Sequence, residues 1–186
     1  MKPSRFSALT AAFLVATLPM LALAGDPEPG LFDFGKLMPP GNGGQFVEVN
    51  VSPGLLGIAA TLTSKQEPEV SDLIRSLKSV RVNVIGLDDS NREALLTQIQ
   101  KVRTELEGKG WERVVTVNEK GQDVGVYIKH RGEEAIEGVV VTVLEPGKEA
   151  VFINVVGDLK PEKIALLGEK LNIAPLSKLS GAVKKS

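Results

Sequence analysis

The chain has 186 residues, no cysteine and one histidine, and its 22 basic and 23 acidic side chains nearly balance. The absence of cysteine excludes disulfide bonds, thiol catalysis, iron–sulfur clusters and zinc–thiolate sites. A slightly acidic chain with 4% aromatic residues lacks the basic face and stacking side chains of nucleic-acid-binding proteins. We therefore expect a domain that is stabilised by its hydrophobic core and that has no nucleic acid partner.

Residues 1–24 have the pattern of a secretory signal peptide. A basic start and an apolar middle are followed by Ala22-Leu23-Ala24, which places small residues where signal peptidase reads them. An uncleaved membrane anchor is the alternative, but Pro19 stands where a spanning helix should be strongest. We predict cleavage before Gly25, export to the periplasm or the exterior, and no membrane association of the mature protein.

The remaining sequence divides into an arm, one domain and a tail. Residues 25–45 are rich in Pro and Gly, which indicates an extended segment. Within this arm, Phe32 and Phe34 predict a strap that packs on the domain, and a recognition segment for a partner is the alternative. Residues 46–174 are expected to form a single domain, and residues 175–186 a flexible basic tail.

The first half of the domain alternates strands and helices. Period-two alternation predicts strands at residues 46–51 and 80–85. Between them, Ser52 and Pro53 are suited to begin a helix, and Pro68 begins a second helical piece. The apolar stripe of the first of these helices consists of Leu55, Ile58, Ala59 and Leu62.

The clearest helix follows the second strand. Ser90 and Glu93 have the spacing of a capping box, and Gly108 and Gly110 are expected to end the helix. One face of this helix carries Leu95, Ile99, Val102 and Leu106, which predicts that it packs against the sheet.

The second half is predicted to be a meander of two hairpins over residues 111–157. The first hairpin turns at residues 118–122 and the second at residues 145–148, where Pro then Gly suits a type II turn. Pro161 is expected to open a last helix, whose apolar residues are Ile164, Leu167 and Leu171.

The predicted order is β-α-β-α-β-β-β-β-α. We expect an α+β fold, a two-layer sandwich in which a largely antiparallel sheet has its helices packed on one face. The strands at residues 138–144 and 150–156 are apolar on both sides, so the second face should be covered as well. The strap, a helix or another molecule could provide this cover, and the pattern is the best sequence indication of a protein partner or homodimer.

No residue is assigned a catalytic, cofactor-binding or metal-binding role. His130 is expected to be an exposed turn residue, because one histidine cannot form the multi-imidazole site of most catalytic zinc centres. Asp88, Asp89 and Asp158 precede helices, and helix capping explains them better than cation binding. Trp111 is expected to fill a corner of the core.

The segment Leu77-Lys-Ser-Val-Arg-Val-Asn-Val-Ile85, the capped helix and Gly110-Trp111 resemble the exported bacterial proteins grouped as domain of unknown function 4252. The stretches Val126–Lys129, Ile136–Val141 and Val155–Asp158 resemble them too, so the resemblance covers roughly residues 45–172. These motifs are structural and carry no reactive group. The resemblance implies export and an α+β domain without a known activity.

Three functional hypotheses follow. The first is a non-enzymatic binding or interaction module of the cell envelope, whose partner is an envelope protein or a second copy. The second is a periplasmic hydrolase that uses Asp88, Asp89 or Asp158. The third is peripheral membrane attachment through residues 175–186, which is weak because a few lysines contribute only about 1 kcal/mol each near anionic lipid.

Overall fold

The computed structural model describes residues 28–41, 43–119, 121–132, 135–160, 163, 164, 166 and 168. The predicted signal peptide and the predicted basic tail lie outside the described residues, as does most of the last predicted helix. Helical backbone is described at residues 163, 164, 166 and 168, inside that predicted helix.

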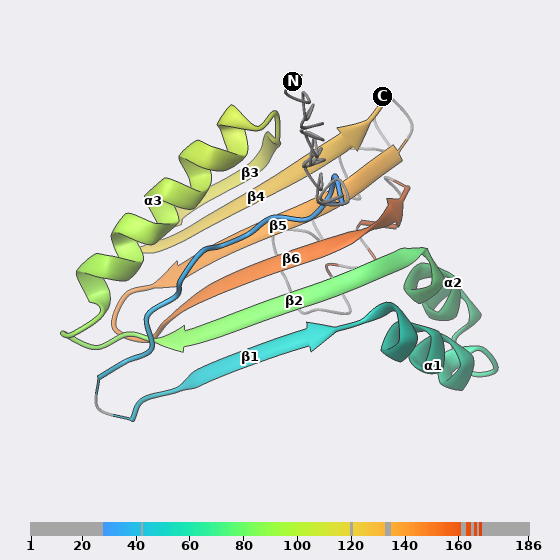
Figure 1. Ribbon diagram of the computed structural model, residues 1–186, viewed down its shortest axis with the longest axis horizontal. Coiled ribbons are helices and arrows are strands. Elements are labelled where there is room, and N and C mark those ends of the chain that lie inside the picture. Colours follow the sequence, from blue (N-terminus) through green and yellow to red (C-terminus); the bar gives the residue numbers. More distant parts are fainter. Residues whose placement is uncertain are drawn as a thin grey trace, which may run out of the picture.

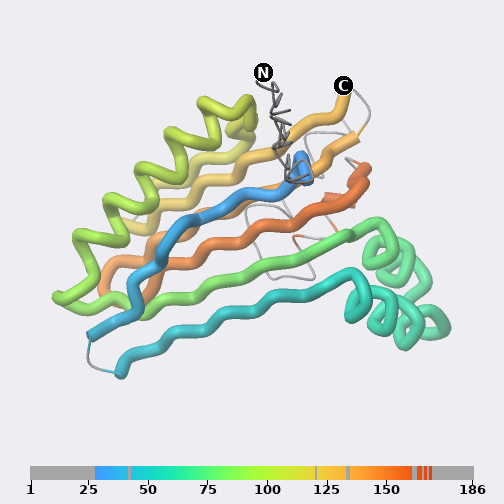
Figure 2. The backbone as a smooth tube through the Cα atoms, in the orientation of Figure 1, coloured from blue at the N-terminus to red at the C-terminus, as the bar shows by residue number. Residues whose placement is uncertain are grey.

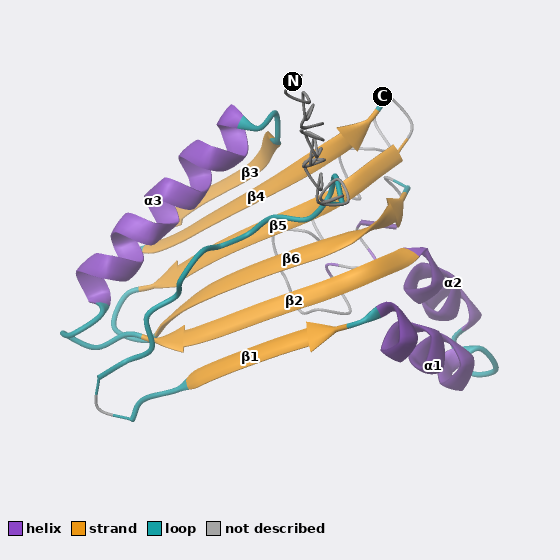
Figure 3. Ribbon diagram, in the orientation of Figure 1, coloured by secondary structure: helices purple, strands orange, loops and turns teal. Residues whose placement is uncertain are grey.

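One six-stranded antiparallel sheet forms the framework, with the strand order β1-β2-β6-β5-β4-β3 (Figure 1). The strands are β1 (Phe46–Val51), β2 (Leu77–Gly86), β3 (Glu112–Glu119), β4 (Gln122–Arg131), β5 (Ala135–Glu145) and β6 (Glu149–Leu159). The helices are α1 (Pro53–Thr63), α2 (Pro68–Ser76) and α3 (Arg92–Gly108). The predicted α+β class, the antiparallel meander and the order of the elements are thus confirmed (Figure 3).

Both faces of the sheet are buried, and each has its own hydrophobic cluster. We call the face that carries Tyr127, Val140 and Phe152 the strap face, and the face that carries Val126, Val141 and Val155 the back face. A strand of period two places successive side chains on opposite faces, so the apolar runs in β5 and β6 supply both clusters. The prediction that these strands are apolar on both faces is therefore confirmed.

Helix α3 covers part of the strap face. Its Leu95, Ile99, Val102 and Leu106 are all at most 2% exposed, which confirms the predicted apolar face. The capping box is wrong, because the helix is preceded by Asn91 at the N-cap and the Ser90 hydroxyl donates to Asp88 Oδ1 at 2.5 Å. The Ser90 hydroxyl, which was expected to cap a backbone N–H in the first turn of the helix, is bound to the Asp88 carboxylate instead.

The expectation that all helices pack on one face is wrong. Leu56 of α1 and Leu73 of α2 belong to the back-face cluster, together with Ile164, whereas α3 lies on the strap face. The physical reason is that a sheet with two apolar faces must be covered on both. The helical segments are shared between the two faces accordingly.

The orientation of α1 also differs from expectation. Leu55, Ile58 and Leu62 of the predicted core stripe are 54%, 59% and 75% exposed, while Leu56 and Ala60 are buried instead. Helix α2 packs on the side of Ala60, where the Ser71 hydroxyl donates to the Ala60 carbonyl at 2.7 Å. Because α1 is apolar around most of its circumference, its sequence could not show which side faces the core.

The arm crosses the strap face as an extended strap, which the tube in Figure 2 shows passing over the middle of the sheet. Phe32 and Phe34 are 2% and 5% exposed, with ring centroids 5.6 Å apart. The Phe34 ring lies 5.4 Å from Phe152, and Phe32 packs edge-on against Trp111 at 6.2 Å. The predictions of a strap and of a core position for Trp111 are confirmed.

Candidate functional site

The strap is fixed in its middle by one buried side chain. Asn154 of β6 is fully buried on the strap face, where its Oδ1 accepts the Phe32 N–H at 2.9 Å. Its Nδ2 donates to the carbonyls of Gly30 at 3.0 Å and Val139 at 3.2 Å. The strap backbone also lies directly on β5, since a Cβ on Gly30 would meet the Glu137 carbonyl oxygen at 1.9 Å. The strap is therefore an integral layer of the fold.

Asp88 fixes the far end of the strap. Its Oδ2 accepts the Gly41 N–H at 3.1 Å, and its Oδ1 accepts the N–H groups of Ser90 at 2.8 Å and Asn91 at 3.2 Å. These hydrogen bonds, the one from the Ser90 hydroxyl first, lower the pKa of Asp88 below the ordinary aspartate value. The carboxylate thus joins the strap to the start of α3, which fits the predicted structural role.

Because Asp88 is held in its charged form, its contribution to the free energy of unfolding should depend on pH. Because the pKa of Asp88 is lower in the folded than in the unfolded chain, its stabilising effect is present above about pH 3.9 and is lost as the pH falls through the folded pKa. We expect Asp88→Asn to lower the free energy of unfolding at neutral pH and to match the unchanged protein in acid. Urea unfolding across pH measures this, with Asp89→Asn as control, since Asp89 is exposed and lies 4.0 Å from Arg92. An equal effect of both substitutions at every pH would contradict this role.

The other candidate polar residues lie apart in the structure. Asp158 pairs with Arg131 at 2.6 Å, and both side chains are exposed. His130 is in β4, not in a turn as expected, and its Nε2 lies 3.0 Å from Glu112 on β3. Within the part of the chain that is described, no three acidic or histidine side chains gather as a metal site would require.

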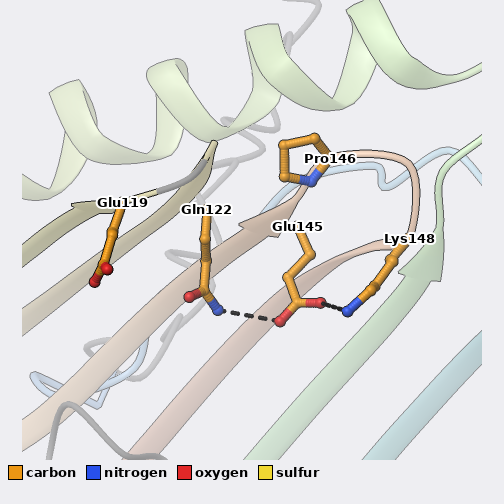
Figure 4. Close-up of a pocket in the computed structure, with 5 residues that line it drawn as sticks. All are labelled: Glu119, Gln122, Glu145, Pro146 and Lys148. Carbon is orange, nitrogen blue, oxygen red and sulfur yellow. Dashed lines mark hydrogen bonds and ion pairs between the residues drawn. The ribbon is translucent and has the colours of Figure 1, made fainter.

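A polar hollow lies where the β3–β4 and β5–β6 turns meet. It is lined by Glu119, Gln122, Glu145, Pro146 and Lys148 (Figure 4). Glu145 accepts hydrogen bonds from Gln122 at 3.1 Å and from Lys148 at 2.9 Å, and the bond to Glu145 raises the pKa of Lys148. Glu145 is therefore held by both Gln122 and Lys148, and the charges of Glu145 and Lys148 compensate each other inside the hollow.

A second polar surface covers the strap-face side of β1 and β2. Two adjoining cavities of about 190 and 500 Å³ share Glu48, Asn50 and Arg81. Asn50 donates to Glu48 at 2.8 Å, while the half-buried Arg81 makes no side-chain hydrogen bond or ion pair to any described residue. An unpaired guanidinium in a groove is a group that a carboxylate from another molecule could engage.

Beside this groove, β1 forms an open edge of the sheet. Phe46, Val47 and Val49 are 42%, 40% and 42% exposed, and β1 follows β2 without a register shift. The strand has no Lys, Arg or Pro, residues with which proteins often protect a sheet edge, and Glu48 is its one charged residue. Its outer backbone groups have no strand partner among the described residues.

The opposite edge, β3, is protected. It carries Glu112, Arg113 and Glu119, and its pairing with β4 is interrupted by an irregularity between Arg113 and Val115. Charges and bulges of this kind discourage the addition of another strand. The two edges of one sheet therefore differ, and only β1 has the character of a template for strand pairing.

Exposed apolar side chains also lie on α1, the next element along the chain. Gly54, Gly57, Ile58, Thr61 and Leu62 line a shallow, largely apolar depression on this helix. No helix in the described ranges has the length and apolar character needed to cross a membrane. We call the two adjoining cavities that share Glu48, Asn50 and Arg81 the Arg81 groove. The outer edge of β1, the Arg81 groove and the exposed side of α1 are together called the β1 surface.

The β1 surface was not found by sequence reasoning. Val47 and Val49 alternate as in any half-buried strand, and Arg81 is one polar residue of an alternating strand. The signal that could have pointed to it was the uniformly apolar composition of α1, which no single buried side accounts for.

The comparisons with known proteins concern almost the whole of this domain. A comparison with curated proteins gave no significant match. A family model matches residues 42–167, which include both sheet edges, the three helices and the β1 and β2 residues of the groove, but not the strap residues that line it. By this match, as the resemblance in the sequence predicted, the chain belongs to the family described as a domain of unknown function (DUF4252).

Proposed function

We propose that this protein is exported through a cleaved signal peptide and that its domain is a non-enzymatic binding module, which holds an extended protein segment along the outer edge of β1. The observation that carries the proposal is the contrast between the two edges of the sheet: β3 is charged and irregular, while β1 is regular and has exposed Val47 and Val49. An open edge strand binds by adding one more strand to its sheet, with main-chain hydrogen bonds supplying affinity.

The groove beside β1 supplies specificity in this proposal. An added strand would place alternate side chains over the strap-face side, where Asn50 and the unpaired Arg81 lie. Its remaining side chains would lie with Val47 and Val49 on the back-face side. The expected ligand is therefore an extended segment that alternates acidic or polar residues with apolar ones.

The carboxylates support a non-enzymatic function. Asp88 accepts hydrogen bonds from three backbone N–H groups, and Asp158 pairs with Arg131. Neither aspartate lines the polar hollow or the Arg81 groove. The stability changes expected for Asp88→Asn differ from those of a hydrolase residue, whose replacement would abolish an activity and leave stability intact.

The export part of the proposal predicts the N-terminus of the mature protein. The intact mass of the protein recovered from the cell envelope fraction should correspond to a chain that begins at Gly25. A chain recovered there with residues 1–24 still attached would contradict cleavage and favour an anchor.

The binding part predicts cross-links that depend on position. A photoreactive amino acid at Val49, activated in living cells, should give covalent adducts with protein, whereas the same amino acid at the exposed Thr116 on β3 should not. A second photoreactive residue at Phe46 should lose its adducts when Val49→Lys places a charge on the edge, and Thr116→Lys is the matched control. Equal cross-linking from the two edges, or none from β1, would overturn the proposal.

A further inference from the structure

The β1 strand is complementary to itself. In antiparallel pairing about a two-fold axis, Val49 would stand opposite Val49 of a second copy, and Val47 opposite Val51 of that copy. The valines would then meet valines on the back-face side. On the strap-face side, Glu48 would stand opposite Asn50 of the second copy.

The charges of β1 and β2 favour this register. Asn50 pairs with Arg81 across β1 and β2, so Glu48 of the second copy would extend the same cross-strand row. The Cα atoms of Arg81 and that Glu48 would be about 10 Å apart, two strand spacings, which an arginine and a glutamate side chain together can span. By symmetry the pair forms twice.

The neighbouring registers are less favourable. A shift of two residues in one direction sets Glu48 against Glu48 of the second copy, and like charges directly opposite are destabilising. A shift of two residues in the other direction sets Asn50 against Asn50 of the second copy and Glu48 against Ser52. In this register no glutamate lies in the cross-strand row of Arg81. A shift of one residue would turn valines toward polar side chains.

From this complementarity we infer that the segment held by β1 is β1 of a second copy, so that two sheets join edge to edge with two Glu48–Arg81 pairs across the interface. The inference rests on the proposed function, because it names the partner of the same edge. It also gives a role to the Arg81 guanidinium, which makes no hydrogen bond or ion pair to a described side chain within one copy.

The test is a charge exchange at the interface, measured by sedimentation equilibrium on the protein as purified from cells. The unchanged protein should be dimeric. Glu48→Arg and Arg81→Glu should each raise the dimer Kd about tenfold or more, because each leaves two like charges in every row. When the two variants are mixed, opposite charges face each other again in both rows, and a mixed dimer should form. This rescue shows that neither variant failed by misfolding.

The matched control is Glu112→Arg, which makes the same charge change on β3 and should leave the Kd unchanged. A dimer whose Kd is unaffected by either β1–β2 variant, or variants that do not recover on mixing, would overturn the inference. A monomeric protein whose β1 cross-links to a different protein would overturn it as well, while the proposed function would stand. A monomer with no β1 cross-links would overturn both.

Discussion

Replacement of Asn154 by Leu is expected to lower the free energy of unfolding by about 3 kcal/mol, because buried polar groups that lose their partners are costly. The Phe32 N–H and the carbonyls of Gly30 and Val139 would each lose a hydrogen bond to this side chain. Urea unfolding measures the loss, and amide exchange should show faster exchange along the strap than in α3.

The matched control is Asn83→Leu on β2, since Asn83 is half-buried and makes no side-chain hydrogen bond to a described residue. This change should alter stability by no more than about 0.5 kcal/mol. Equal losses from the two substitutions would show that Asn154 does not fix the strap.

A second large loss is expected from Phe32→Ala. The Phe32 ring is 2% exposed, packs edge-on against Trp111, and lies 5.1 Å below the Lys109 ammonium. Removing a buried aromatic ring costs about 3–5 kcal/mol, through lost transfer energy and the cavity left behind. Thermal or urea unfolding of the variant measures the change.

Phe46→Ala is the control for ring removal, because Phe46 on β1 is 42% exposed and should cost about 1 kcal/mol or less in the monomer. If Phe32→Ala cost no more than Phe46→Ala, the strap would be a peripheral attachment and the strap-face core would be complete without it.

Most of the strands and α3 could be predicted from the sequence, because their patterns are local. Alternation at period two marks β1 and β2, and the Pro146-Gly147 turn has Gly147 at a φ of 72°, as a type II turn needs. The strap was predictable because two close phenylalanines in a Pro- and Gly-rich arm need a surface to cover.

The positions of the elements could not be predicted, because they depend on pairing between distant residues. The pairing of β2 with β6 leaves β1 at an edge, and nothing in the alternation of β1 distinguishes an edge strand from an inner one. The α1 orientation depends on contacts with α2 that its own apolar sequence does not specify. The β1 surface could not be predicted from the sequence, because it depends on these distant pairings.

The two-sided apolar strands have a different meaning in the structure. They first indicated a partner, but Phe32, Phe34 and α3 cover one face of β5 and β6, and Leu73 and Ile164 pack in the cluster on the other. The exposed apolar surface lies instead on β1 and α1, so the indication of a partner moves to the β1 surface.

The most direct test of the binding account is backbone amide exchange along β1 in the intact periplasmic fraction, where the proposal places the protein, compared with dilute purified protein. We expect the outward-facing amides of β1 to exchange more slowly in the periplasmic fraction, because another strand would bind them there, and those of β3 to exchange equally in both. Exchange along β1 that is equally fast in both samples and matches that of Val49→Lys would contradict the account.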